Sequence, residues 1–356
     1  MNVKDYQKEL IVHSIKDIEQ SHKISSYTDY GSLEINKYSL TFWVRFIKKD
    51  KPFFVYFKIP KIVENNKELL KFDKADISLA EEEFNSLEYL NNNWPSTESV
   101  SFAVPLTFIE KFNLIITERI IGKHLFLELR KPLINLFQKE KLESHLSNLG
   151  RSLSIFHSKH NLKCNFELKE VTKKFQLYIS QLSRYGVNKI NFKLLEKLLN
   201  ENNNFQDSSF LTLNLKGFDV RQIFVNEKGL FIIDPGKIKK SYFESDLARF
   251  IVTLRIINWG SISKVFHLIL SVYIKSSYEK KFLKSYYGKK VMFDKKLSFL
   301  IIKEILKHWI MAHKSIDQKP IPKFLKKVIR LFYLNIYFKN LLFQEIKHFN
   351  KHTNKV

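Results

Sequence analysis

Residues 213–237 read LNLKGFDVRQIFVNEKGLFIIDPGK, and this stretch is the most informative part of the sequence for predicting the fold. Two short apolar runs, 222–225 and 230–233, are separated by the letters NEKG, which favours a β-hairpin with a glycine available for positive φ. A polar loop, 216–221, precedes the hairpin, and Asp234 follows it. Such a hairpin can direct the loop and the carboxylate at one point, as metal-assisted phosphoryl transfer requires.

The stretch resembles the catalytic and metal loops of the protein-kinase-like small-molecule phosphotransferases, which include aminoglycoside, choline and lipopolysaccharide sugar kinases. Further segments resemble parts of that family, in its order: the lysine strand YFKIPK (56–61), the glutamate helix EEEFNSLEYL (81–90), the hinge TERIIG (117–122), the helix LGRSLSIFHS (149–158) before the catalytic loop, and the helix start SDLARF (245–250) with a structural aspartate. The resemblance implies an α+β, two-lobed protein-kinase-like fold, with a small antiparallel-sheet lobe and a large, mainly helical lobe.

The catalytic loop departs from the family pattern, which is His-Gly-Asp followed five residues later by Asn. If Gln222 stands for that asparagine, Gly217 stands where the catalytic aspartate belongs and Leu215 where the histidine belongs. The only carboxylate in the loop is Asp219, two residues late. The metal loop reads Asp-Pro-Gly in place of Asp-Phe-Gly, so Asp234 keeps the carboxylate. These residues support a nucleotide and metal site better than they support a catalytic base.

The resemblance implies roles for individual residues. The implied site residues are Asp219, Arg221 and Lys216 for catalysis, Lys58 and Glu83 for ATP, and Asp234 and Gln222 for Mg²⁺. Lys58, positioned by Glu83, would bind the phosphates. Asp219 would be the base or orient the substrate. Lys216 and Arg221 would neutralise phosphate charge in the transition state.

Residue type alone gives other interpretations of several of these positions. Lys58 by itself is typical of a solvated strand lysine. Glu83 favours an inward ion pair with Lys58, because it lies at the edge of the apolar face of a helix predicted for residues 77–91. Asp246 is at least as well explained as a helix cap. His157 is typical of a buried, hydrogen-bonded residue rather than a catalyst.

The first part of the chain predicts a small sheet. Residues 1–30 indicate a helix with an extended tail, residues 38–60 a hairpin, and residues 104–121 two further strands. No Gly-x-Gly-x-x-Gly phosphate loop is present, so phosphate binding would depend on Lys58 and on backbone N–H groups before residue 39.

After residue 121 the pattern is mostly helical, which predicts a small nucleotide-side lobe over 1–121, with an N-terminal extension, and a large lobe over 122–356. The large lobe would contain the hairpin and basic C-terminal helices. Residues 322–349 interleave apolar and basic side chains at helical spacing. A core helix with a solvated face, a membrane-surface helix and a nucleic-acid-binding helix all fit that pattern.

Composition indicates a globular, intracellular chain. Of the 356 residues 44% are hydrophobic, and 32 are Phe. The single cysteine, Cys164, excludes an intramolecular disulfide and a cysteine metal cluster, which suits a reducing cytoplasm. The first ten residues resemble no secretion signal, and the apolar run 268–274 is too short to span a bilayer. We therefore expect a cytoplasmic protein that could also contact the inner face of the cytoplasmic membrane peripherally.

The net charge of +24 is unevenly distributed. Residues 1–121 carry 16 Lys and Arg against 18 Asp and Glu, whereas residues 122–356 carry 44 against 18. A positive field attracts anions, so the expected acceptor is anionic: an acidic or phosphorylated sugar, or a glycolipid head group. An AT-rich genome, indicated by abundant Lys, Ile, Asn and Phe, is the alternative explanation of the lysines.

These observations predict an ATP- and Mg²⁺-dependent phosphotransferase that acts on a hydroxyl of a small, anionic acceptor in surface glycan biosynthesis. The alternative is a catalytically inactive kinase-fold protein that binds or scaffolds in glycan or lipid assembly. A basic nucleic-acid-binding protein is the weakest alternative, because no known nucleic-acid-binding module is present.

Overall fold

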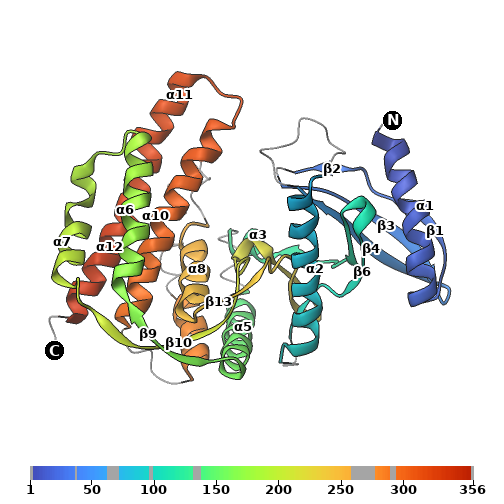
Figure 1. Cartoon of the computed structure of the whole chain (residues 1–356), viewed down its shortest axis with the longest axis horizontal. Coiled ribbons are helices and arrows are strands. Elements are labelled where there is room, and N and C mark those ends of the chain that lie inside the picture. The colour runs from blue at the N-terminus through green and yellow to red at the C-terminus, as the bar shows by residue number, and fades with distance from the viewer. Residues whose placement is uncertain are drawn as a thin grey trace. The chain divides into compact units, whose positions relative to one another are not determined.

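The computed structural model describes residues 3–36, 38–61, 72–95, 99–130, 138–257, 277–288 and 294–353. They form two compact units: unit 1 comprises Met1–His124 and Gln222–Ile238, and unit 2 comprises Leu125–Arg221 and Lys239–Val356 (Figure 1). The apolar run 268–274 lies outside the described residues. None of the described helices is both long and apolar enough to cross a membrane.

Unit 1 is built on a six-stranded antiparallel sheet in the order β1-β3-β4-β7-β6, with β2 paired to β3. Its strands are β1 Ile24–Tyr30, β2 Glu34–Ile35, β3 Ser39–Lys48, β4 Lys51–Pro60, β6 Pro105–Ile109 and β7 Leu114–Glu118. The predicted hairpin is confirmed as β3 and β4. Its turn residues, Lys49 and Asp50, have φ of 49° and 59°. Positive φ at both central residues gives a turn whose twist matches that of the strands.

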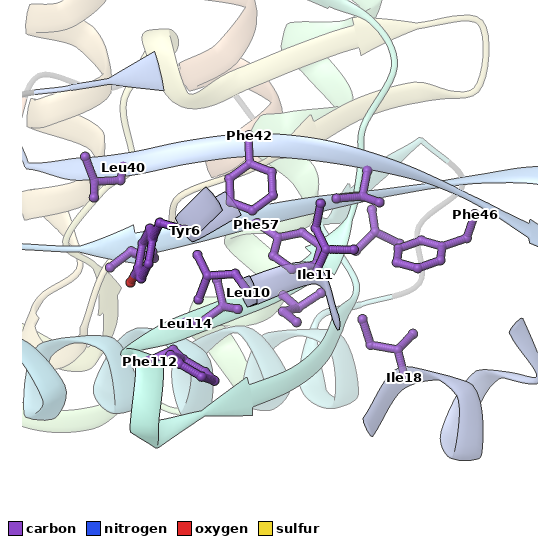
Figure 2. Close-up of a cluster of buried hydrophobic side chains, with 14 of the residues drawn as sticks. Tyr6, Leu10, Ile11, Ile18, Leu40, Phe42, Phe46, Phe57, Phe112 and Leu114 are labelled. Carbon is purple, nitrogen blue, oxygen red and sulfur yellow. The ribbon is translucent and has the colours of Figure 1, made fainter. Parts of the chain in front are cut away.

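One face of this sheet is covered by helix α1, Val3–His22. Leu10 and Ile11 of α1 belong to the same buried cluster as Phe42 of β3 and Phe57 of β4, and the two phenylalanine rings stack 4.7 Å apart (Figure 2). Because side chains alternate along a strand, Tyr56 and Lys58, on either side of Phe57 in β4, point to the opposite face of the sheet. The predicted helix with an extended tail is thus observed as α1 followed by β1.

The predicted hairpin after the polar loop is also confirmed, as β11 Ile223–Asn226 and β12 Gly229–Ile232. Gly229 has φ 133°, and a Cβ built there would lie 2.4 Å from the carbonyl oxygen of Ser99. Glycine therefore allows β5, Val100–Phe102, to pair with β12.

The hairpin strands belong to a four-stranded sheet of unit 1 in the order β5-β12-β11-β8, where β8 is Lys123–His124. The sequence interpretation had assigned the hairpin to the large lobe, whereas its strand pairing and contacts group it with unit 1. The division at residues 121 and 122 stays a prediction.

Unit 2 is mainly helical. Its main described elements are α3 Leu125–Arg130, α5 Lys139–Lys159, β9 Leu162–Glu167, α6 Leu168–Arg184, α7 Lys193–Glu201, β10 Gln206–Leu215, β13 Ile238–Tyr242, α8 Glu244–Arg255, α10 Lys295–Asp317, α11 Lys323–Val328, the π-helical turn Ile329–Leu334 and α12 Asn335–Thr353. Figure 1 shows α10 beside α6 and α12, and it also packs on α8. Helix α10 buries side chains around most of its circumference, as expected of a central helix.

Candidate functional site

Lys58, Glu83 and Asp234 form one ion-pair network within unit 1. Nζ of Lys58 lies 2.5 Å from Oε1 of Glu83 and 3.3 Å from Oδ2 of Asp234. The side chains of Lys58 and Glu83 are 17% and 9% exposed, and that of Asp234 is 34% exposed. The structure therefore brings together three of the residues that the sequence singled out, from three separate segments.

Local structure explains the positions of the lysine and the glutamate. Lys58 lies on the face of β4 opposite the buried Phe57 and Ile59. Glu83 lies on α2, Lys74–Asn93, one turn before the buried Leu87. A capping box at the start of α2 satisfies its first N–H groups and so stabilises the helix that presents Glu83.

The segment that follows Asp234 is bound to α2 at two points. Lys237 forms an ion pair with Glu82, and the backbone N–H of Ile238 donates to Oγ of Ser86 at 3.2 Å. These contacts hold the Asp-Pro-Gly loop against α2, the helix that carries Glu83. The sequence reasoning did not find this contact, because Lys237 and Glu82 are distant in the chain and each is typical of a solvated charge.

The electrostatics of the network leave one negative charge in excess. Burial acts to lower the pKa of Lys58, but Asp234 and Glu83 outweigh it and raise that pKa, so the amine stays protonated. Burial raises the pKa of Glu83, against the attraction of Lys58. Two carboxylates thus share one ammonium group.

A magnesium ion fits this donor set. Mg²⁺ in phosphoryl-transfer sites takes one or two protein carboxylates, with phosphate and water oxygens completing its shell. Among the described contacts Asp234 is bound through Oδ2 alone, so Oδ1 remains available. The carbonyl of Gln222 accepts from the N–H of Ile233 at 3.0 Å, which puts Gln222 at the same end of the hairpin as Asp234. The described residues contain no cluster of three or more His, Cys, Asp or Glu placed to hold a metal.

The remaining predicted residues, Lys216, Asp219 and Arg221, belong to unit 2. Lys216 is exposed and Asp219 is buried. Oδ1 of Asp219 accepts from the backbone N–H and from Nε of Arg221, both at 2.9 Å, and Oδ2 accepts from Nη2 of Arg221. Burial acts to raise the pKa of Asp219, but Arg221 outweighs it and lowers that pKa. Asp219 is therefore a weak base while Arg221 holds it.

Asp246 and His157 are buried beneath the start of the polar loop. Oδ2 of Asp246 accepts from the backbone N–H of Leu215 at 3.0 Å and lies 3.3 Å from Nε2 of His157. Nδ1 of His157 lies 2.8 Å from the hydroxyl of Tyr286. The helix-cap interpretation of Asp246 is wrong: the N-cap position of α8 is Phe243, and Asp246 instead fixes the backbone at Leu215. The interpretation of His157 as a buried, hydrogen-bonded residue is confirmed.

No protein-family model matches the sequence, and no curated protein matches it. Solved structures do match it. An amicoumacin kinase in complex with AMP-PNP, Ca²⁺ and Ami has a TM-score of 0.54 and 10% identity, over 95% of this chain and 96% of that chain. A choline kinase from Cryptosporidium parvum Iowa II has a TM-score of 0.50 and 12% identity, over 98% and 96%.

A glucosamine kinase in complex with glucosamine, ADP and inorganic phosphate has a TM-score of 0.50 and 9% identity, over 91% of this chain and 93% of that chain. At such identities the likeness is one of fold. The antiparallel sheet of unit 1 and the helices of unit 2 agree with the predicted α+β class. The chain therefore has the protein-kinase-like fold of small-molecule kinases, as its sequence segments predicted.

Proposed function

We propose that this chain is an ATP- and Mg²⁺-dependent phosphotransferase that phosphorylates a hydroxyl group of a small molecule. The observation that carries the proposal is the contact of Lys58 with both Glu83 and Asp234. A lysine held by a helix glutamate, next to a metal-binding carboxylate, is the arrangement that protein kinases use for the phosphates of ATP. In support, the solved structures with this fold include complexes with AMP-PNP and Ca²⁺ and with ADP.

Each residue of the network has a separate task in this proposal. Lys58 would bind phosphate oxygens, and Glu83 would keep its ammonium group in place. Asp234, with Gln222 beside it, would hold Mg²⁺, which when bound neutralises charge on the phosphates.

The polar loop would complete the reaction. Lys216 and Arg221 would stabilise the negative charge of the transferring phosphoryl group. Nε and Nη2 of Arg221 donate to the two carboxylate oxygens of Asp219, so Arg221 would have to leave Asp219 to offer this pair of donors to the phosphoryl group. Its departure would also remove the attraction that lowers the pKa of Asp219, and would so turn Asp219 into a stronger base for the acceptor hydroxyl.

The acceptor class is proposed from charge. The kinases of similar fold act, by their names, on choline, glucosamine and amicoumacin, but residues 122–356 of this chain carry 44 basic against 18 acidic residues. Such a field concentrates anions. An acidic or phosphorylated sugar, or a lipopolysaccharide-type glycolipid head group in surface glycan biosynthesis, is the acceptor that we favour.

A glycolipid acceptor would require contact with a membrane surface, and the C-terminal helices offer one. From α11 to the start of α12 an apolar stripe is exposed to solvent: Phe324 74%, Leu325 39%, Val328 37%, Leu331 45%, Phe332 71% and Ile336 51%. The exposed Lys323 and Lys327 flank it. Exposed aromatic and basic side chains on one helix are typical of binding to an anionic bilayer, here the inner face of the cytoplasmic membrane. The core-helix interpretation holds for α12, where Phe338 and later apolar residues are buried, but is wrong for α11.

Nucleotide-dependent thermal stabilisation tests the proposal. ATP with Mg²⁺ should raise the melting temperature. At a ligand concentration 100 times Kd, binding adds about 2.7 kcal/mol to the free energy of unfolding. Asp234→Asn should remove the metal-dependent part, and Lys58→Met most of the remainder. Lys51→Met, an exposed lysine of the same strand, is the matched control. A wild-type protein that is not stabilised at saturating ATP and Mg²⁺ would refute the nucleotide site.

A catalytically inactive kinase-fold binding protein is the second candidate function. Gly217 stands where the family has its catalytic aspartate, and the nearby Asp219 is engaged by Arg221. Nucleotide binding without phosphate transfer to any acceptor in a broad screen would favour it. The weakest candidate, nucleic-acid binding, would instead show an affinity that falls steeply with salt concentration.

A further inference from the structure

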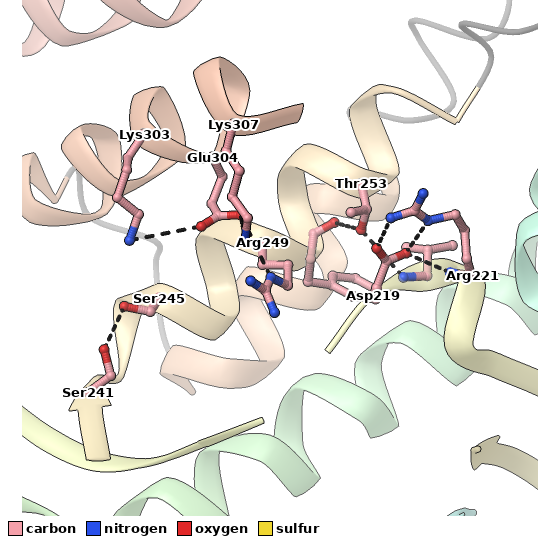
Figure 3. Close-up of polar contacts among 11 residues, drawn as sticks. Asp219, Arg221, Ser241, Ser245, Arg249, Thr253, Lys303, Glu304 and Lys307 are labelled. Atoms are coloured by element: carbon pink, nitrogen blue, oxygen red, sulfur yellow. Dashed lines mark hydrogen bonds and ion pairs between the residues drawn. The ribbon is translucent and has the colours of Figure 1, made fainter. Parts of the chain in front are cut away.

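Three cationic side chains surround one buried carboxylate inside unit 2, and the proposed catalytic residues do not include them. Arg249 lies on α8, and Lys303 and Lys307 lie on α10, as does the carboxylate, Glu304. Nε of Arg249 is 3.7 Å from Oε2 of Glu304, Nζ of Lys307 is 3.3 Å from the same oxygen, and Nζ of Lys303 is 3.9 Å from Oε1 (Figure 3). We call these four residues the Glu304 cluster.

The Glu304 cluster holds more positive charge than Glu304 can neutralise. One carboxylate needs one cation, so two positive charges are in excess, and the two lysines are four residues apart on one helix, where like charges repel. Burial lowers the pKa of Lys303 and of Lys307, and the neighbouring cations add to it. Charge that is partly out of water and lacks a partner is costly, so a cluster with an excess of cations fits an anionic ligand.

The three cations remain within reach of a ligand. The side chains of Arg249 and Lys303 are each 19% exposed and that of Lys307 is 30% exposed, whereas Glu304 is 5% exposed. The carboxylate thus lies behind the cations and holds them in place. A guanidinium offers paired donors to an oxyanion, and lysines add mobile point charges, so the set suits a phosphate group.

The cluster lies next to the polar loop that the proposed function uses. Arg249 is one helical turn before Thr253 on α8, and residues four apart share a helix face. Oγ1 of Thr253 is 3.4 Å from the backbone nitrogen of Val220, within the loop that ends at Arg221. Figure 3 shows the loop residues and the Glu304 cluster along this side of α8. An anion bound to the cluster would therefore lie close to the polar loop.

We propose that Arg249, Lys303 and Lys307 bind a phosphate monoester carried by the acceptor, on a sugar or on a lipid head group. A phosphate monoester carries about −1.5 to −2 charge at pH 7, which matches the excess of the cluster. The role in acceptor recognition rests on the proposed phosphotransferase function, but binding of the phosphate monoester can be measured without it. Glu304 would act as a positioning residue and would not touch the ligand.

The test uses three sugars with the same ring and different charge, added to the full chain without nucleotide. Glucose 6-phosphate should bind and raise the melting temperature, whereas glucose and glucosamine should not. Lys303→Gln and Lys307→Gln should each weaken glucose 6-phosphate binding by about tenfold or more, as for loss of a charged hydrogen bond. Both variants should fold, because each removes a repulsive neighbour and leaves Glu304 with two cations. Lys197→Gln, an exposed lysine of α7 paired with Glu201, is the control for loss of charge.

Two further experiments distinguish phosphate binding at the Glu304 cluster from the proposed phosphotransferase function and identify the source of the phosphate. Asp234→Asn should lose metal-dependent ATP binding and keep glucose 6-phosphate binding, so either idea can fail alone. Vesicles that contain phosphatidic acid should compete with glucose 6-phosphate if the natural ligand is a lipid head group, and should not compete if it is a soluble sugar. Binding of glucosamine at least as tight as that of glucose 6-phosphate would overturn the inference. So would glucose 6-phosphate binding that is unchanged in Lys303→Gln and Lys307→Gln.

Discussion

Replacing Lys58 by methionine should destabilise the protein far more at pH 8 than at pH 5. Lys58 is the ammonium group of a network with two carboxylates, and Glu83 is 9% exposed. Without Lys58, Glu83 is a buried carboxylate that has lost its cation. Burial already raises its pKa, and the opposing attraction of Lys58 disappears in the variant. A carboxyl group whose folded pKa is raised favours the native state below its unfolded pKa and loses that contribution as pH rises through the folded value.

The two partners of Lys58 set the size of the effect. Removing one partner of a buried ion pair costs about 3–5 kcal/mol, and we expect about 3 kcal/mol for Lys58→Met at pH 8 because Glu83 can take up a proton. At pH 5 the loss should be smaller, because a raised pKa keeps more of Glu83 protonated and therefore neutral. Glu83→Gln should cost less than Lys58→Met at pH 8, because Lys58 keeps Asp234 at 3.3 Å. Adding Glu83→Gln to Lys58→Met should recover part of the loss.

Urea denaturation of the nucleotide-free protein at both pH values measures these differences, with Lys51→Met as the reference variant for a lysine lost from β4. Two results would contradict the reasoning. One is a loss of stability in Lys58→Met that does not depend on pH. The other is a cost of Glu83→Gln equal to that of Lys58→Met at pH 8.

Three further predictions follow from the geometry. Asp219→Asn should lower turnover by roughly 10²–10⁴-fold with little change in ATP affinity, as expected for a general base. Burial, and after it the charge of Asp294, raises the pKa of Glu244 from 4.5 to about 7, so wild-type stability should fall as pH rises from 4.5 to 7. In urea denaturation, Glu244→Gln should remove roughly 3 kcal/mol of that pH dependence. Replacing Phe324 and Phe332 by serine should abolish co-sedimentation with anionic vesicles, because these rings are 74% and 71% exposed beside lysines.

Each of these predictions has a result that would count against it. Unchanged turnover in Asp219→Asn would assign the base elsewhere. Parallel pH–stability curves for Glu244→Gln and wild type would show that the buried carboxyl does not titrate as proposed. For the vesicle experiment, Phe210→Ser is the control, since Phe210 is an exposed phenylalanine of β10. Equal wild-type binding to neutral and anionic vesicles at low and high salt would exclude the charge-assisted contact.

The positions of Lys58 and Glu83 could be predicted because they depend on the periodicity of a single strand and a single helix. The two-residue period of strand 51–60 put Lys58 opposite its apolar neighbours, and the helical period around Glu83 put that side chain at the edge of the buried face. Turn chemistry at residues 226–229 predicted the hairpin that precedes Asp234. These features need only neighbours within a few residues, so the sequence could predict them.

Features that depend on distant contacts could not be predicted in this way. Asp246 lies in the first turn of α8, so its short polar side chain matches the pattern of a helix cap. Only its contact with the backbone N–H of Leu215, 31 residues earlier in the chain, shows its role. An amphipathic pattern shows that a helix has an apolar face but not whether another element covers it, which is why the core-helix interpretation of residues 322–349 fits α12 and fails for α11. The Glu304 cluster had one sequence signal. Lys303, Glu304 and Lys307 are the charged residues in the middle of an otherwise apolar helix.

The contact between Arg221 and Asp219 bears directly on the choice between an enzyme and a binding protein. Arg221 occupies both oxygens of Asp219 and lowers its pKa, so the loop in this structure has neither a free base nor a free guanidinium. An incoming phosphoryl group is a stronger anion than a carboxylate and could attract Arg221 away, which would free both groups in one event. If the chain is a kinase, Arg221→Gln should therefore lose transition-state stabilisation while Asp219 becomes more basic. Turnover should then fall, and its acidic limb should move to higher pH. If the chain only binds, the pair is structural, and Arg221→Gln should change stability and leave ATP affinity as it was.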